Sequence, residues 1–232
     1  MSEQMVREDV MPDCVLCPPL RFRFNAMAGL PGEPTVLAAD GDFFLMPDLA
    51  PLVEGHVLLV TARHSQCAGA FDGRLWRRAW AWRDRVARMY RAAYGSPDLI
   101  MLEHGPGTSQ GGGACIDHAH WHLLPITAGV RAVLEERGLR GVPATLDALR
   151  ARIRDGRSYL LVEEEGVPMV YPGDGVPSQF LRWAVSVALG HEPGVPWRWQ
   201  ETFGLPGSRA RFMRTLLALR QGQADGRVDS HQ

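Results

Sequence analysis

The sequence contains no uninterrupted apolar run long enough to span a bilayer, and its first residues lack the charged and then apolar plan of a secretory signal. It also lacks a strong charge of either sign, because its formal net charge at pH 7 is −1. General attraction to the phosphates of a long nucleic acid is therefore not expected, although a locally positive pocket for a small ligand is compatible with this charge. We expect a cytoplasmic protein that binds a small molecule and neither a membrane nor a long nucleic acid.

Cysteine is scarce, with 4 residues among 232, at positions 14, 17, 67 and 115. In a cytosolic chain the spacing of Cys14 and Cys17 points to metal or redox chemistry more than to a structural disulfide, so we expect no disulfides. Internal repeats are absent from the sequence as well. The length allows one sizeable domain, or a compact domain with a substantial extension, around a buried core.

The first half of the chain alternates predicted strands with one long helix. Short apolar runs at 35–39, 42–46 and 55–62 predict neighbouring antiparallel strands. Apolar side chains recur at helical spacing from Phe71 to Tyr94, with arginines mostly between them, which predicts an amphipathic helix ended by Gly95 and Pro97. We interpret the arginines as a solvated face rather than an RNA-binding surface. Strands at 99–103 and 115–124 flank a glycine-rich loop, and the whole order predicts an α+β fold with an antiparallel sheet.

Beyond Pro125 the pattern changes. We predict helices at 130–137 and 144–154, a hairpin of 159–164 with 168–171, and a helix that Ser178 caps and that runs to Leu189. These elements suggest a domain at 1–127, a C-terminal α/β extension at 128–221 that packs on it, and a polar, disordered tail at 222–232.

Three histidines alternate along the last strand of the first half. Alternate side chains of an extended strand share a face, so His118, His120 and His122 are expected to line one surface. Alternation alone also fits a surface histidine cluster or a simple three-histidine metal site.

The surroundings of these histidines favour one family. The stretch from Asp117 to Pro125 resembles the pattern of the histidine-triad (HIT) proteins, in which apolar residues separate three histidines and two more apolar residues follow. The stretch Gly-His-Val-Leu-Leu-Val-Thr-Ala-Arg-His at 55–64 resembles the strand that precedes the long helix of the same family. The resemblance covers roughly residues 14–125. It implies a HIT-like antiparallel sheet and a nucleotide phosphate site.

The resemblance also implies catalytic roles for His118, His120 and His122. Neutral imidazole is a good nucleophile near pH 7, and its phosphoramidate is reactive enough to be hydrolysed or transferred again. By this match His120 attacks the α-phosphorus and becomes nucleotidylated, while His122 hydrogen-bonds phosphate oxygens or the leaving group. His56 corresponds to a histidine near the phosphate site of some relatives, and a partly buried histidine at the edge of the core is the alternative.

A phosphate site is also expected in the glycine-rich loop. Backbone N–H groups around Gly113, Ala114 and Cys115 are able to approach a phosphate closely, because the preceding glycines leave space. Many HIT relatives carry Gly-Gln-Ser here, so Cys115 replaces a hydroxyl donor and its side-chain contact is in question.

Two polar residues of the C-terminal part are further candidates. The segment around Gln179 and Arg182 faintly resembles one that follows the HIT domain in CwfJ-like proteins. An arginine fork suits anionic oxygens, so both residues are candidate phosphate or substrate ligands. An ordinary capped helix with a solvated arginine is the alternative.

A zinc site is implied near the N-terminus. Cys14 and Cys17 offer two thiolates at zinc spacing, and a closed tetrahedral site needs two more ligands. In the zinc-containing branch of the HIT family, which resembles galactose-1-phosphate uridylyltransferase in this respect, these ligands correspond to His64 and His118. His118 would then be structural and would help to position the histidine strand. The alternative is a pair of reduced cysteines in an apolar segment, and Cys67 has no predicted partner.

The resemblance therefore implies a nucleotide hydrolase or nucleotidyltransferase that acts at an α-phosphate through a nucleotidyl-histidine. Dinucleoside polyphosphates, nucleoside phosphoramidates and nucleotide sugars all fit as substrates. The alternatives are a phosphorylase, in which inorganic phosphate is the acceptor, and a nucleotide-binding module without turnover. Homodimerisation is left open.

Overall fold

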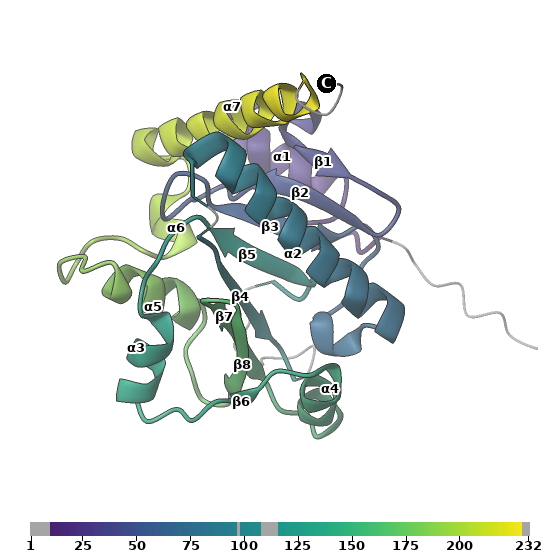
Figure 1. The fold of residues 1–232 in the computed structure, drawn as a ribbon, viewed down its shortest axis with the longest axis vertical. Helices are drawn as coiled ribbons and strands as arrows, with labels where there is room; N and C mark the ends of the chain where they lie inside the picture. The colour runs from purple at the N-terminus through teal and green to yellow at the C-terminus, as the bar shows by residue number, and fades with distance from the viewer. Residues whose placement is uncertain (1–9, 97, 108–115, 229–232) are drawn as a thin grey trace, which may run out of the picture.

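The computed structural model describes residues 10–96, 98–107 and 116–228, with the side chains of 223–228 left out. The described chain forms an eight-stranded sheet in the order β1-β2-β3-β5-β4-β7-β8-β6, and all neighbouring strands are antiparallel (Figure 1). The strands are β1 (Ala38–Ala39), β2 (Phe43–Pro47), β3 (Val57–Thr61), β4 (Ile100–Gly105), β5 (His120–Leu124), β6 (Val142–Pro143), β7 (Tyr159–Glu164) and β8 (Val167–Pro172).

Seven α-helices surround this sheet in the described part of the chain. They are α1 (Leu20–Met27), α2 (Gly73–Tyr94), α3 (Val130–Glu136), α4 (Leu146–Arg154), α5 (Phe180–Ala188), α6 (Trp199–Thr202) and α7 (Pro206–Val228), and Glu33–Thr35 and Ala68–Ala70 are short 3-10 helices. Among the helices described, none combines the length and the apolar character that crossing a membrane requires.

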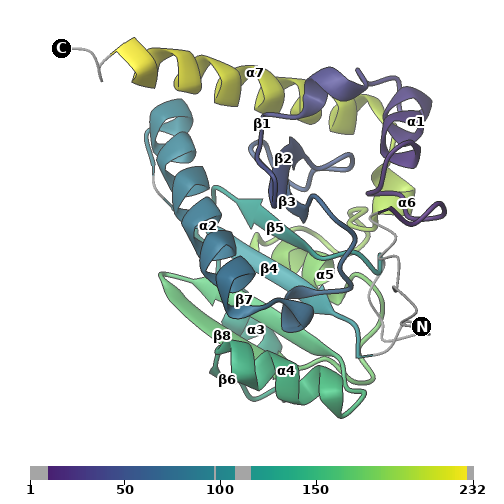
Figure 2. The same cartoon turned by 90° about the vertical axis from the view of Figure 1, so that its right-hand side faces the viewer.

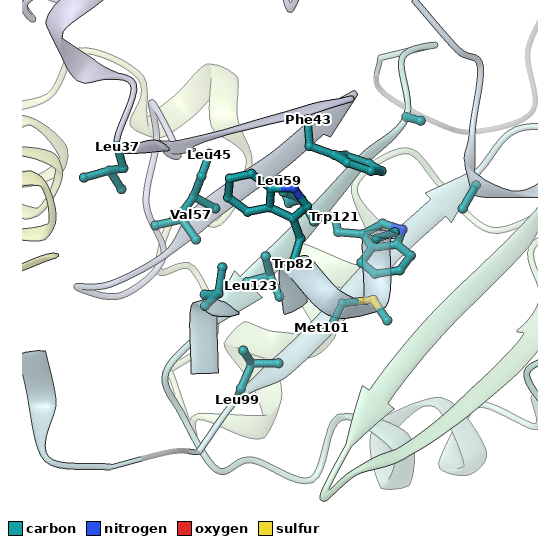
Figure 3. Close-up of a cluster of buried hydrophobic side chains, with 14 of the residues drawn as sticks. Leu37, Phe43, Leu45, Val57, Leu59, Trp82, Leu99, Met101, Trp121 and Leu123 are labelled. Carbon is teal, nitrogen blue, oxygen red and sulfur yellow. The ribbon is translucent and has the colours of Figure 1, made fainter. Parts of the chain in front are cut away.

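Helix α2 covers one face of the sheet. The Asp72 side chain caps its first turn by accepting a hydrogen bond from the Leu75 N–H, and Gly95 ends it in a left-handed conformation, with φ of 72°. The buried side of α2 packs on the strands, where Trp82 points toward Leu59 (Figure 3). Helix α7 lies against α2 at the end of the sheet where β1 and β2 lie (Figure 2).

The opposite face of the sheet is covered by two separate layers. The N-terminal segment around Leu16 packs on β2 and β3 through Phe44, Met46 and Leu58. Helices α3 and α5 pack on β4 and β7, which lie beyond β5 in the sheet. The candidate site described below lies between these two layers.

The α+β fold with an antiparallel sheet and a long amphipathic helix is confirmed. The hairpin of β7 and β8 and the helices α2 to α5 also occupy the predicted regions. The sheet continues across the predicted boundary at residue 127, because strand β4 of the first part pairs with strand β7 of the second part. The division into domains at 127 therefore stays a proposal, and the two parts share one continuous sheet.

Three local predictions need correction. Strand β5 begins only at His120, so His118 precedes the strand. Gln179, and not Ser178, occupies the N-cap of α5; its backbone is left-handed, with φ of 64°, and no side chain caps the helix. The predicted disordered tail begins at residue 222, whereas α7 continues to Val228 and residues 229–232 lie outside the described ranges.

Candidate active site

Strand β5 places two of the three histidines beside one another in the middle of the sheet. His122 pairs with Leu58 on β3 and with Leu102 on β4, and His120 pairs with Val60 on β3. Alternation turns Trp121 toward α2, where its ring contacts Trp76 and Trp80, and turns His120 and His122 to the opposite face. The two imidazole rings lie 5.0 Å apart between their centroids.

A pocket opens over these two histidines. Its apolar wall includes Val15, Leu16 and Phe24 from the N-terminal layer. It also includes Leu181, Trp199 and Phe203 from the C-terminal layer, which consists of α3, α5 and the region of α6. Its polar lining contains five residues that were selected from the sequence: His56, His120, His122, Gln179 and Arg182. It also contains Asp48 and His104, to which no role was assigned from the sequence. An apolar pocket with a few convergent polar groups is the usual form of a small-molecule site.

His120 is held in one orientation by the backbone of its own strand. Its Nδ1 lies 2.6 Å from the His118 carbonyl oxygen, so this nitrogen donates the hydrogen bond. In the neutral imidazole the other nitrogen, Nε2, is then unprotonated and is a potential nucleophile. Burial lowers the pKa of His120 to about 3, with a further contribution from His122.

His56 and His122 form a second pair in the pocket. The Leu52 N–H donates to His56 Nδ1 over 3.2 Å, and His56 Nε2 lies 2.9 Å from His122 Nδ1. His56 is fully buried, and burial keeps its pKa well below the usual histidine range. The alternative was a partly buried histidine at the edge of the core. His56 is instead fully buried, and it also lines the pocket and contacts His122.

Asp48, in the loop after β2, lies behind this histidine pair. Its Oδ2 lies 3.5 Å from His56 Nε2, 3.4 Å from His122 Nδ1 and 3.3 Å from an Arg182 guanidinium nitrogen. Its Oδ1 accepts a hydrogen bond of 2.6 Å from the Ala50 N–H. Burial by itself raises the pKa of this carboxyl, but His56 and Arg182 outweigh burial and hold it well below its usual range.

Gln179 and Arg182 both reach the pocket, and both bind other protein groups there. Arg182 is only 6% exposed, which excludes the predicted alternative of a solvated arginine. The Gln179 side chain accepts a hydrogen bond from the Trp199 N–H and donates to Gln200. These contacts tie the C-terminal layer to the pocket wall.

A different cluster forms where the N-terminal segment meets the residue before β5. Cys14 Sγ and Cys17 Sγ lie 3.3 and 3.5 Å from His118 Nδ1, and Cys17 Sγ lies 3.6 Å from His64 Nδ1. Ligand atoms around a tetrahedral zinc ion, with bonds of about 2.0–2.3 Å, are separated by about 3.3–3.8 Å. The four side chains predicted as ligands therefore form a cluster that is able to bind a metal ion.

The hydrogen bonds of His118 fit this use. Its Nε2 lies 3.0 Å from the Thr61 carbonyl oxygen, which only a protonated nitrogen can bind. In the neutral ring Nδ1 is then unprotonated and faces the two thiols, as a metal ligand requires.

Asp48, His56 and His122 also have the spacing of a metal site. Their hydrogen bonds argue against it, because the Leu52 N–H occupies the lone pair of His56 Nδ1 and leaves the proton on Nε2, where a metal would bind. Arg182 adds a positive charge 3.3 Å from Asp48 Oδ2, which disfavours a second cation there.

Some site residues were missed or remain outside this description. Asp48 follows β2 without any local pattern that could have singled it out, and no role was assigned from the sequence to His104 on β4. The predicted phosphate-binding residues Gly113, Ala114 and Cys115 lie outside the described residues.

Comparison with known families gives one partial match. A model described as a protein similar to the CwfJ C-terminal region matches residues 31–135, which is less than half of the chain. The matched segment includes His56, His120 and His122. Curated protein sequences give no significant match.

Solved structures of HIT proteins are distantly similar. The HIT-like protein involved in cell-cycle regulation from Bartonella henselae is 19% identical, with a TM-score of 0.34 over 53% of this chain and 85% of that one. The Plasmodium falciparum diadenosine triphosphate hydrolase is 15% identical, with a TM-score of 0.35 over 53% and 78%. The yeast Ap4A phosphorylase Apa2 is 15% identical, with a TM-score of 0.37 over 67% and 66%. At such low TM-scores these alignments add no argument about the activity of this chain.

Proposed function

We propose that this protein is a HIT-type nucleotide hydrolase or nucleotidyltransferase that cleaves at an α-phosphate through a nucleotidyl-His120 intermediate. The observation that carries the proposal is the orientation of His120 in the pocket. Its Nδ1 donates 2.6 Å to the His118 carbonyl, which leaves the Nε2 lone pair for attack on phosphorus.

The proposed reaction has two steps. In the first, Nε2 of His120 attacks the α-phosphorus, the P–N bond forms, and the bond to the leaving group breaks with its electron pair on the leaving oxygen or nitrogen. In the second, water attacks the same phosphorus, a P–O bond forms, the P–N bond breaks with its electron pair returning to Nε2, and one proton of the water is released, which gives the nucleoside monophosphate and neutral His120. His122, beside His120 in the pocket, is assigned to hydrogen bonding with phosphate oxygens or the leaving group.

The apolar wall of the pocket suits the planar ring of a nucleobase. Phe24, Trp199 and Phe203 lie in the apolar wall, and Phe203 contacts both other rings edge to face. These rings are assigned to the nucleobase. Gly113, Ala114 and Cys115 remain candidates for the phosphate, on the sequence argument alone.

We further propose that Cys14, Cys17, His64 and His118 hold a structural zinc ion. The separations of their ligand atoms and the unprotonated Nδ1 of His118 support this assignment. Zinc at this place would fix the N-terminal segment to the residue before β5. His118 then acts on catalysis only by positioning the strand that carries His120.

The proposed function is tested with a panel of nucleotides. Diadenosine polyphosphates, adenosine phosphoramidate and a nucleotide sugar are incubated with the protein, with and without inorganic phosphate, and products are identified by mass. Release of a nucleoside monophosphate in both conditions supports a hydrolase, and a nucleoside diphosphate formed only with phosphate supports a phosphorylase. Binding of these nucleotides without any product would contradict the proposal and favour a binding module.

A further inference from the structure

Arg182 connects the C-terminal layer to the floor of the pocket. Its guanidinium donates to Asp48 Oδ2 over 3.3 Å, to the Ala50 carbonyl over 2.6 Å and to the Trp197 carbonyl over 2.9 Å. These partners belong to the loop after β2 and to the segment before α6. A side chain held in this way is better suited to fix the charge of Asp48 than to follow a substrate.

The hydrogen bonds that join Leu52, His56 and His122 have one direction, from donor to acceptor along this order. The Leu52 N–H donates to His56 Nδ1, so the proton of neutral His56 is on Nε2. That proton points to His122 Nδ1, 2.9 Å away, which therefore accepts. The proton of neutral His122 is then on Nε2.

Asp48 is the group that could reverse this arrangement. Its Oδ2 lies 3.4 Å from His122 Nδ1, close enough to draw a proton onto that nitrogen. Arg182 offsets the carboxylate charge from the other side. The titratable and charged groups around His122 are Asp48, His56, His104, His120 and Arg182.

We infer that Arg182 is a positioning residue which, by balancing the charge of Asp48, keeps the proton of His122 on Nε2, the ring nitrogen that does not face Asp48 and His56. The inference deepens the proposed function, since this N–H is the donor that His122 would offer to a phosphate oxygen or to the leaving group. It also makes the C-terminal layer part of the candidate active site, because α5 supplies the arginine.

The test compares charge-changing variants by NMR of full-length protein labelled with ¹⁵N-histidine. The nitrogen shifts of an imidazole distinguish a protonated from an unprotonated ring nitrogen, so no substrate is needed. At about pH 7, wild-type His122 is expected to carry its proton on Nε2. In Arg182→Met the uncompensated Asp48 is expected to draw a proton onto His122 Nδ1, as an imidazolium or as the other tautomer.

The double variant Asp48→Asn/Arg182→Met separates this role from a merely structural one. It lacks both charges, so the proton of His122 is expected on Nε2 again, although the packing change at residue 182 persists. Arg83→Met is the matched control, because Arg83 also pairs with a buried carboxylate, that of Glu163. Neither of these two residues lines the pocket. It is expected to leave His122 unchanged.

Two results would overturn the inference: an unchanged His122 in folded Arg182→Met, or an altered His122 that the double variant fails to restore. If Arg182→Met does not fold, Arg182→Gln removes the same charge and is expected to show the same proton on His122 Nδ1; a wild-type His122 already protonated on Nδ1 would also contradict the inference. The outcome is independent of the proposed chemistry. Absence of a nucleotidyl-His120 adduct would refute the proposed function and leave these spectra valid.

Discussion

The two histidine clusters beside β5 contain the same ring type and use it in opposite ways. In the cysteine cluster a backbone carbonyl, that of Thr61, accepts the Nε2 proton of His118 and leaves a lone pair facing two thiols. In the pocket a backbone N–H, that of Leu52, donates to His56 and leaves a proton on the nitrogen that faces its partners. The backbone partner of each ring therefore decides whether a cluster is suited to hold a cation or to donate hydrogen bonds.

The largest expected effect lies in the pocket. His120→Ala is expected to lower turnover by about three orders of magnitude or more, because the substituted protein has no nucleophile, while nucleotide binding is kept. Steady-state kinetics and ligand titration measure both. His191→Ala is the control, since His191 is exposed and bonds Ser186 away from the pocket lining. Turnover of His120→Ala within a few-fold of wild type would contradict the role of His120.

The second effect lies in the cysteine cluster. Cys17→Ser is expected to lose zinc and to lower Tm by about 10 °C, because loss of a ligand weakens a site whose binding energy contributes to folding. Metal analysis and thermal unfolding measure this. Cys67→Ser is the control, since Cys67 is equally buried and lies outside the cluster. A wild-type protein that contains no zinc after purification without chelators would refute the metal assignment.

The third effect compares two buried carboxyls. Asp48 lies beside Arg182, whereas Glu103 on β4 accepts hydrogen bonds only from neutral groups among its described partners, the Tyr159 hydroxyl and the Ala68 N–H. Burial raises the pKa of Glu103 from 4.5 to about 7 despite these donors. Folded Glu103 thus stays protonated at pH values where the unfolded chain has ionised.

The folded state then binds more protons, so the free energy of unfolding is expected to fall as the pH rises from 4.5 to about 7, by roughly 3 kcal/mol from this group. Glu103→Gln is expected to remove this part of the pH dependence, which chemical denaturation at several pH values would measure. Asp48 contributes with the opposite sign, because its lowered pKa gives stability that is lost as the pH falls below 3.8. An unchanged slope in Glu103→Gln would show that Glu103 ionises normally.

The smallest effect is expected at the pocket wall. Trp199→Ala is expected to raise KM about tenfold with little change in kcat, since a stacked base contributes about 1–3 kcal/mol and does not take part in the chemistry. Kinetics with one substrate measure both constants. Trp76→Ala, which removes a tryptophan that contacts Trp80 and Trp121 on the α2 side, is the control for loss of packing. A fall in kcat alone would place Trp199 elsewhere in the mechanism.

The sequence was most informative where the signal is local. The alternation of His120, Trp121 and His122 predicted two faces of a strand, and the 3.6-residue period from Phe71 predicted α2, because both patterns depend on neighbours in the chain. Helix α7 was not predicted, although Phe212, Leu216 and Leu219 recur at helical spacing; these side chains are buried, and the helix packs against α2.

Long-range pairing could not be predicted in the same way. Arg182 lies 134 residues after Asp48, and their ion pair depends on how α5 packs over the sheet. The faint resemblance to a segment of CwfJ-like proteins suggested Arg182 as a phosphate or substrate ligand, while its hydrogen bonds favour a positioning role. The cysteine and histidine cluster was predicted from a family pattern, and spacing alone would have given only the pair Cys14 and Cys17.

The central claim is that the pocket passes a nucleotide through a covalent bond to His120. Mixing the protein with a dinucleoside polyphosphate and quenching rapidly without acid is expected to add the mass of one nucleoside monophosphate to the peptide that carries His120, and acid should remove it, as for a phosphoramidate. His120→Ala should show no adduct, and His122→Ala should form it more slowly. Rapid turnover without any adduct, under conditions that trap the intermediate of a known HIT enzyme, would contradict the account and favour direct attack by water.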